Sequence, residues 1–244
     1  FLNNEEDDMP TETALEYGAA IYYSLGCQSS DDPSDSSTKI ENCFRVYDCS
    51  FVHNMISNFG GAIYISIENN EPYEPIEITR CVFNENGARF ALGEAGGAKG
   101  YGGSIYYVLS QSSESTNNNP SLTINKCKFV NNFAVKSGGS IYLLIKDSQS
   151  SRSIEIYNCS YSYYEWGDWI GGENIILTLD GGFISYIVES SSGSNKNPPL
   201  HINNCSFSSN IDTFFNDNGN TEIGGCIYFD IKNSHHIGTI EKLN

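Results

Sequence analysis

Cysteine is the residue type with the most reactive side chain in this chain, and five of its eight copies recur at one position of a repeated phrase. These five residues are Cys49, Cys81, Cys127, Cys159 and Cys205. Each is followed two residues later by Phe or Tyr, so an extended backbone places thiol and ring on the same side. No Cys-x-x-Cys spacing of the zinc-binding kind is present, and we expect neither a metal site nor a cofactor.

The regular spacing of these cysteines indicates stacked, parallel copies of one strand. Neighbouring strands lie about 4.8 Å apart, which falls within the Cα separation of a disulfide. Side chains that stack in parallel point the same way, however, and this favours a ladder of buried, free thiols that pack as small apolar groups. Disulfides between consecutive positions are the alternative. Cys27 and Cys43 lie off the ladder and could pair with each other.

Groups capable of proton transfer also recur once per repeat. They are Glu77, Thr123, Glu155 and His201, each in the outward slot of an apolar-x-apolar segment. Paired carboxylates or a carboxylate beside a histidine would suit acid–base cleavage of polysaccharides. The same stripe would also serve as a solvated polar face.

Two coupled phrases position all of these residues. The first phrase is an apolar-x-apolar segment, then Cys-x-aromatic, then two further residues and Asn. Its aromatic positions from Phe51 to Phe207 are 32, 46, 32 and 46 residues apart. Its asparagines would form a hydrogen-bonded ladder at one corner, although Tyr164 replaces Asn in the fourth copy. The ladder asparagines are Asn54, Asn86, Asn132 and Asn210.

The second phrase is Gly-Gly, a small residue, Ile and Tyr, as in Gly60 to Tyr64. Apolar residues alternate with period two, which indicates strands. One repeat cannot bury its apolar face alone, but stacked repeats can. We therefore expect one inner wall to be formed by the phrase's isoleucines, which are Ile63, Ile105, Ile141, Ile184 and Ile227.

Aromatic side chains suggest two binding surfaces. The outward slot of the Gly-Gly strand holds Tyr22, Tyr64, Tyr106, Tyr142 and Tyr228. These rings would stack on one another or pack beneath a loop, or else form a platform for sugar rings or a neighbouring subunit. Trp166 and Trp169 lie beside acidic residues in one insert, where they would fill a groove or bind sugar.

Charge and motifs restrict the partners. The formal net charge is −17, which disfavours nucleic acids and anionic lipid surfaces. No apolar run approaches the roughly 20 residues of a membrane-spanning helix, so no direct membrane insertion is expected. Asn158 and Asn204 begin Asn-Cys-Ser sequences that fit the N-glycosylation acceptor pattern.

The phrases Phe-x-x-Asn and Gly-Gly-Ala-Ile resemble the repeat of the chlamydial polymorphic outer membrane proteins, which also occurs in large protist surface proteins. The resemblance extends roughly from Phe44 to Tyr228. It implies a right-handed β-helix at a cell surface, with an adhesive role. Together with the repeats, it predicts an all-β fold, a single-stranded right-handed parallel β-helix (solenoid) of about six coils.

We expect residues 1–244 to form one β-helix domain, either a segment of a longer chain or a subunit that stacks end to end. The predicted function is a non-catalytic, extracellular or cell-surface structural or adhesive protein that assembles into a filament or a longer solenoid. The alternative is a carbohydrate-active enzyme or carbohydrate-binding module on a pectate-lyase-like β-helix. The expected partners are other copies of itself or flanking coils, and beyond these carbohydrate or a host surface.

Overall fold

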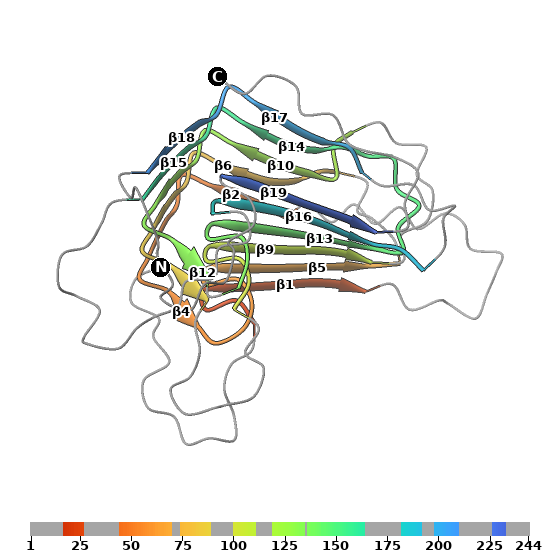
Figure 1. The fold of residues 1–244 in the computed structure, drawn as a ribbon, viewed down its shortest axis with the longest axis horizontal. Helices are drawn as coiled ribbons and strands as arrows, with labels where there is room; N and C mark the ends of the chain where they lie inside the picture. Colours follow the sequence, from red (N-terminus) through yellow and green to blue (C-terminus); the bar gives the residue numbers. More distant parts are fainter. Residues whose placement is uncertain are drawn as a thin grey trace, which may run out of the picture.

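The described part of the chain is composed of short β-strands without any helix (Figure 1). A computed structural model describes residues 17–26, 44–69, 74–88, 100–110, 119–134, 136–163, 182–191, 198–209 and 226–232. Every strand pair in these ranges is parallel, as expected where strands separated by long connections meet in one sheet. No helix of the described residues could cross a membrane.

The strands form four sheets, and each of the three larger sheets takes one strand from successive repeats. The six-stranded sheet consists, in order, of β1 (Ile21–Gly26), β5 (Ile63–Glu68), β9 (Ile105–Ser110), β13 (Ile141–Lys146), β16 (Ile184–Glu189) and β19 (Ile227–Lys232). The polar-faced sheet consists of β2 (Arg45–Tyr47), β6 (Ile76–Thr79), β10 (Leu122–Asn125), β14 (Ile154–Tyr157) and β17 (Leu200–Asn203).

The two remaining sheets follow the polar-faced strands along the chain. The Phe sheet consists of β3 (Ser50–Val52), β7 (Val82–Asn84), β11 (Lys128–Val130), β15 (Ser160–Tyr163) and β18 (Ser206–Ser209). The three-stranded sheet consists of β4 (Met55–Ile56), β8 (Gly87–Ala88) and β12 (Phe133–Ala134). Stacked parallel sheets built from repeats are the architecture expected of a β-solenoid.

The register places equivalent residues of successive repeats directly opposite one another. In the six-stranded sheet, Ile105 pairs with Ile63 on one side and with Ile141 on the other. Ile184 then pairs with Ile141 and with Ile227. This confirms the predicted wall of isoleucines. A slip of one residue would turn the whole apolar set outward, so burial of this face fixes the register.

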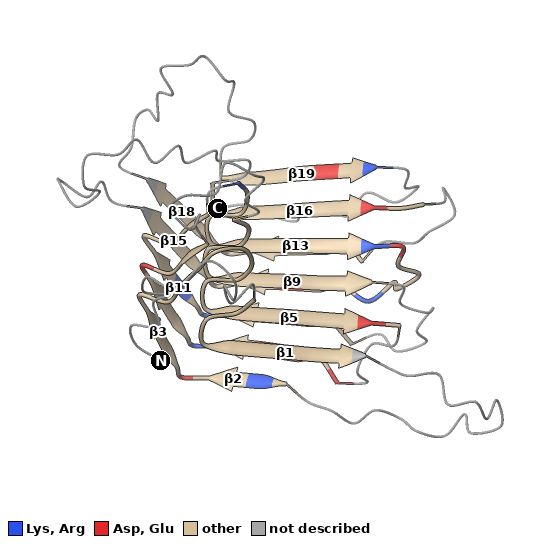
Figure 2. Cartoon of the chain, turned by 90° about the horizontal axis from the view of Figure 1, so that it is seen from below, with Lys and Arg blue, Asp and Glu red and all other residues tan. Residues whose placement is uncertain are grey.

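The core lies between the three larger sheets and consists of their inward residues. In the polar-faced sheet Ile154 and Ile156 are fully buried, whereas Glu155 between them is half-buried on the outer face. Rings of the Phe sheet stack along the core, with centroids 4.9 Å apart for Phe51–Phe83 and Phe83–Phe129. Charged residues accordingly lie at strand ends and on outer faces (Figure 2).

Backbone bends with positive φ separate the sheets. The residue before each ladder cysteine has a φ of 51° to 56°, although its side chain differs between repeats. These residues are Asp48, Arg80, Lys126, Asn158 and Asn204. The left-handed conformation costs such residues about 1 to 2 kcal/mol each, so the stacking of the repeats must impose it.

Close backbone approach accounts for the second glycine of the Gly-Gly phrase. An added Cβ at Gly103 would overlap the carbonyl oxygens of Phe133 and Gly139, which belong to backbone and cannot rotate away. We expect Gly103→Ala to lower the free energy of unfolding by about 3 kcal/mol or more. Denaturant titration would measure the loss. Lys128→Ala, at an exposed strand position, is the control and should stay within about 0.5 kcal/mol of the wild type. Equal stability of both variants would contradict this packing.

Candidate functional site

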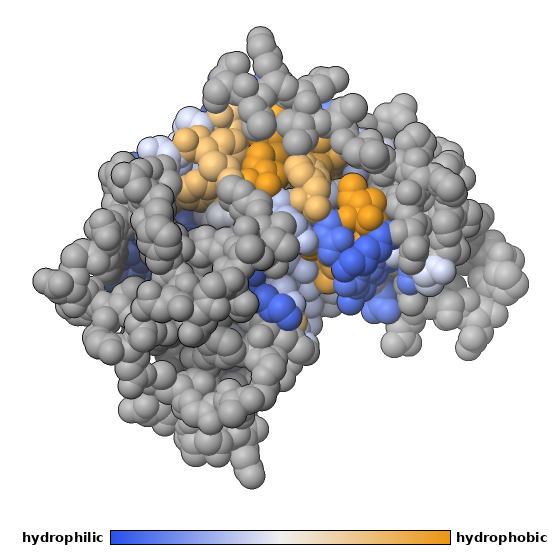
Figure 3. All heavy atoms as spheres, viewed as in Figure 1, coloured by the Kyte–Doolittle hydropathy of each residue, from blue (hydrophilic) through white to orange (hydrophobic). Residues whose placement is uncertain are grey.

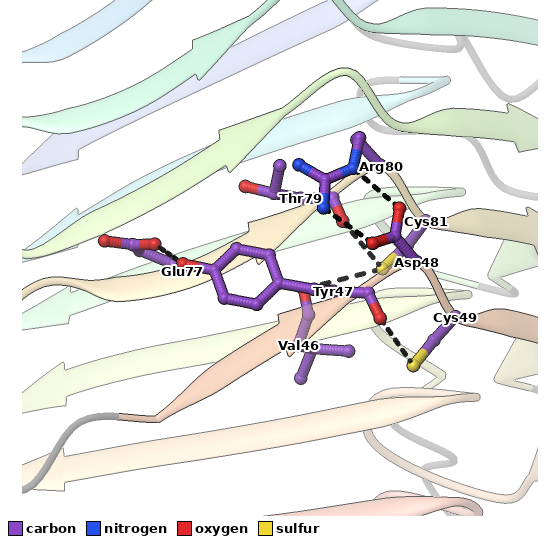
Figure 4. Close-up of polar contacts among 8 residues, drawn as sticks. All are labelled: Val46, Tyr47, Asp48, Cys49, Glu77, Thr79, Arg80 and Cys81. Carbon is purple, nitrogen blue, oxygen red and sulfur yellow. Dashed lines mark hydrogen bonds and ion pairs between the residues drawn. The ribbon is translucent and has the colours of Figure 1, made fainter.

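The structure places the repeated cysteines at equivalent positions of the bend between the polar-faced sheet and the Phe sheet, as Figure 4 shows for Cys49 and Cys81. Cys81, Cys127, Cys159 and Cys205 are buried and free, and Cys49 is half-buried and free. Each thiol faces backbone carbonyls: Cys127 Sγ lies 3.4 Å from Asn125 O and 3.5 Å from Ile78 O. Asn125 O already accepts a hydrogen bond of 2.9 Å from the backbone N of Arg80, so the thiol adds a second contact to a carbonyl that is paired between repeats.

Consecutive ladder cysteines also contact each other: the backbone N of Cys127 donates to Cys159 Sγ at 3.4 Å. Hydrogen bonding to Cys127 and burial raise the pKa of Cys81 and of Cys159 well above the ordinary thiol value. The reactive form of a thiol is the thiolate. We therefore expect Cys81 and Cys159 to be protonated and slow to react in the folded protein.

The asparagine ladder forms a continuous hydrogen-bonded column through Asn54, Asn86 and Asn132. Asn54 donates from its backbone N, at 3.1 Å, and from Nδ2, at 2.8 Å, to Asn86 Oδ1. Asn86 donates in the same way to Asn132 Oδ1, at 2.9 and 3.0 Å. Asn86 Nδ2 also donates to Phe51 O at 3.0 Å. An amide carries both donors and acceptors, so it can bond to the repeats above and below.

The ladder has a defined position in the core. Asn54 and Asn86 are fully buried, and Asn132 is 4% exposed. Asn54 Oδ1 lies at the end of the column and has no donor among the residues that the structure describes.

The outward tyrosines of the six-stranded sheet stack with nearly parallel rings. Centroid distances are 5.2 Å for Tyr22–Tyr64, 5.3 Å for Tyr64–Tyr106 and 5.2 Å for Tyr106–Tyr142. Tyr22 is 58% exposed, whereas the next three rings are at most 9% exposed. Tyr228 packs against the same cluster after the interruption at Ser185, which is buried and bonds Ser137 at 2.8 Å.

A second row of aromatic rings covers these tyrosines. Phe59 stacks between Tyr17 and Tyr101 and meets Tyr106 edge-on at 4.8 Å. Burial raises the pKa of Tyr64 to about 12. The faces of Tyr64, Tyr106 and Tyr142 are therefore occupied by protein, and Tyr22 alone of the four stacked rings is largely open to a ligand.

The outward stripe of the polar-faced sheet brings together the predicted proton-transfer residues. Arg45, Glu77, Thr123, Glu155 and His201 occupy consecutive register positions. At the β2–β6 end of this stripe, Arg45 and Glu77 form an ion pair. Figure 4 shows two further contacts there, between Tyr47 and Glu77 and between Arg80 and Asp48. Tyr47 donates to Glu77, and Arg80 donates two hydrogen bonds of 2.6 Å to Asp48.

At the β14–β17 end the same face is hollowed. Glu155 accepts a hydrogen bond of 3.2 Å from Ser153. Asn158 and Asn204, the two candidate glycosylation residues, are both exposed here. Asn204 Nδ2 donates to Asn158 Oδ1 at 2.7 Å, and Asn158 Nδ2 donates to Asn125 Oδ1 at 3.2 Å.

Several predicted residues lie outside the described residues. They are Asn210, Trp166, Trp169, Cys27 and Cys43. Conversely, the structure shows a buried arginine that the repeats do not indicate: Arg152 is 2% exposed and donates to Asn119 O and Pro120 O at 2.8 and 2.7 Å. Its position within the serine-rich stretch from Ser148 to Ser153 carries no periodic signal from which burial could be inferred.

The asparagine column yields a stability prediction. Asn86→Leu should lower the free energy of unfolding by about 3 kcal/mol, because Asn54 and Phe51 O would lose buried partners at about 1 to 3 kcal/mol each. Asn125→Leu, which removes an amide–amide bond at the exposed Asn158, is the matched control. Denaturant titration should show a loss of no more than about 1 kcal/mol for this control. Comparable losses for the two variants would argue against a special role for the buried column.

Thiol accessibility provides a second prediction. In the native protein a maleimide should label the exposed Cys226 quickly and Cys81, Cys127, Cys159 and Cys205 slowly, and unfolding should abolish the difference. Peptide mass spectrometry would follow each cysteine separately. Cys226→Ser should remove the rapid labelling of its own peptide and leave the slow labelling of the four buried cysteines unchanged. Disulfide-linked peptides that join consecutive ladder cysteines would refute the free-thiol ladder.

Comparisons with known proteins leave the family open. The chain matches no protein-family model, no curated protein and no solved structure. Among the described residues, no three His, Cys, Asp or Glu side chains gather as a metal site would require. Function must therefore be argued from the arrangement of the ladders and of the outer faces.

Proposed function

We propose that the chain is a right-handed, single-stranded parallel β-helix of about six coils and that it serves as a non-catalytic structural or adhesive protein. The six strands of the largest sheet support the number of coils. Parallel strands joined by crossovers are right-handed in nearly all known proteins, which supports the handedness. The resemblance to polymorphic outer membrane proteins supports a place at the cell surface.

One observation carries this proposal: each repeated residue type contributes to the scaffold itself. Four residue types contact their own counterparts in adjacent repeats, as Ile105, Phe83, Asn86 and Cys127 show. Each additional repeat buries the apolar face of the repeat before it, so a chain of this kind is lengthened by adding repeats. Extended, regular surfaces of this kind suit support and adhesion.

The ends of the sheets support assembly with further coils. β17, β18 and β19 lie at one end of their sheets, and Phe207, Ile227, Phe229 and Ile231 there are only partly buried. Figure 3 looks onto this end and shows apolar side chains between the grey parts of the surface. Another copy of the protein, or flanking coils of the same chain, would cover these side chains.

An extracellular location is part of the proposal. The exposed Asn158 and Asn204 at one corner would be accessible to glycosylation in the secretory pathway. The net charge of −17 keeps separate copies apart in dilute solution and opposes association with nucleic acid. Host surfaces and carbohydrates are the proposed adhesive partners.

Assembly can be tested by light scattering and negative-stain imaging at low and high salt. We expect longer rods at high salt, because screening weakens repulsion between acidic copies. Phe229→Glu should prevent elongation by placing a charge at the end strand. Val82→Glu, on an exposed outward position within the stack, is the matched control and should elongate like the wild type. Circular dichroism would check that both variants fold. A monomer at every salt concentration would overturn end-to-end assembly.

A further inference from the structure

A shallow hollow lies on the outer face of the polar-faced sheet, between β14 and β17. Its volume is about 340 Å³, and it is lined by Glu155, Tyr157, Asn158, His201, Asn203 and Asn204. Ligand sites commonly range from about 300 to 1,000 Å³. The hollow is therefore large enough for a small ligand of one or two rings.

Strand register positions its side chains as opposing pairs. Glu155 lies opposite His201, and Tyr157 lies opposite Asn203. The intervening residues, such as Ile156 and Ile202, are buried in the core and hold both strands flat against it. Because the scaffold beneath is packed, these outward groups are presented on rigid strands rather than on loops.

Within the described part of the chain, some polar side chains of this hollow have no hydrogen-bond partner, whereas charged side chains at the other end of the same sheet are paired. Around β2 and β6, Glu77 accepts from Tyr47 and lies 3.8 Å from Arg45 Nε. In the hollow, no described residue hydrogen-bonds the side chains of His201 or Asn203, and Glu155 keeps one carboxylate oxygen unbonded within the described part of the chain. Among the described residues, the polar side chains of this face are therefore paired at the β2–β6 end and partly unpaired at the β14–β17 end.

A row of amides fixes one edge of the hollow. Asn125 holds Asn158, and Asn158 in turn holds Asn204, so the orientation of both side-chain amides is set. Asn204 Oδ1 accepts no hydrogen bond from the residues that the structure describes. Burial and the charge of Glu155 raise the pKa of Tyr157, so its phenol stays a neutral donor.

The side chains that line the hollow determine which class of ligand it can bind. Closely spaced amides, a carboxylate, an imidazole and a phenol offer both donors and acceptors, as the adjacent hydroxyls of a sugar require. Tyr157 adds a ring with an apolar face. An apolar ligand would leave these groups unpaired, and the net charge of −17 disfavours an anionic ligand.

We propose that the hollow between β14 and β17 binds a neutral saccharide of one or two units, with Glu155 and His201 as its central hydrogen-bonding residues. The site goes beyond the scaffold function, because it lies on the outer face of β14 and of the end strand β17, whereas assembly would cover the free edge of β17. It would give the outer face of the protein a specific contact for glycans.

Saturation-transfer NMR and calorimetry with maltose, cellobiose, lactose and N,N′-diacetylchitobiose test this site. We expect at least one disaccharide to bind with a Kd of about 0.1 to 10 mM, in the range of weak binding. Glu155→Ala and His201→Ala should each weaken it at least about tenfold, since a hydrogen-bonding site loses affinity when a partner is removed. Glu77→Ala changes the equivalent outward position at the β2–β6 end and should leave the Kd within about twofold.

Three results would overturn the proposal. The first is that none of the four disaccharides binds saturably. The second is that both Glu155→Ala and His201→Ala leave the affinity unchanged. The third is that digalacturonate binds more tightly than every neutral probe. Circular dichroism of each variant would establish that it is folded. Any of these results would leave the assembly experiment unaffected, because that experiment reports on the edges of the end strands through Phe229→Glu in β19 and not on the outer face of the polar-faced sheet.

Discussion

In-register stacking of parallel strands is the constraint on which the rest of this structure depends. Adjacent strands lie about 4.8 Å apart, so each side chain contacts its counterpart in the repeats before and after it. A residue type is suitable only if it can pack against itself. Isoleucines and aromatic rings meet this condition, as the stacked rings from Phe51 to Phe129 show.

Polar groups satisfy the same constraint in different ways. Asparagine bonds to itself, because one amide donates while the next accepts, and the buried column through Asn86 follows from this. Cysteine donates to nearby carbonyls without a charge. Carboxylates would repel one another if stacked, so the outer stripe alternates Glu77 and Glu155 with Arg45, Thr123 and His201.

The outer faces differ in what they leave for a ligand. On the six-stranded sheet, rings from two rows pack together, and Tyr106 is buried within an external apolar layer. On the polar-faced sheet, the charged side chains of the β2–β6 end are paired, whereas Glu155 at the β14–β17 end forms no ion pair with any residue that the structure describes. Among the described residues of this sheet, the polar groups that remain for a ligand therefore lie at the hollow beside Glu155 and His201.

The sequence by itself determined the strands, their alternation and the residues that form the ladders. A repeat of 32 and 46 residues with a period-two pattern leaves one register in which Ile105, Asn86 and Cys127 all lie inside, because any slip would expose them. Only the tertiary structure decided what covers the outer faces. Phe59 reaches Tyr106 of the next repeat, Arg80 adopts a left-handed bend and Arg152 is buried. These features depend on contacts between different repeats and on the path of the backbone at its bends, which local periodicity does not encode.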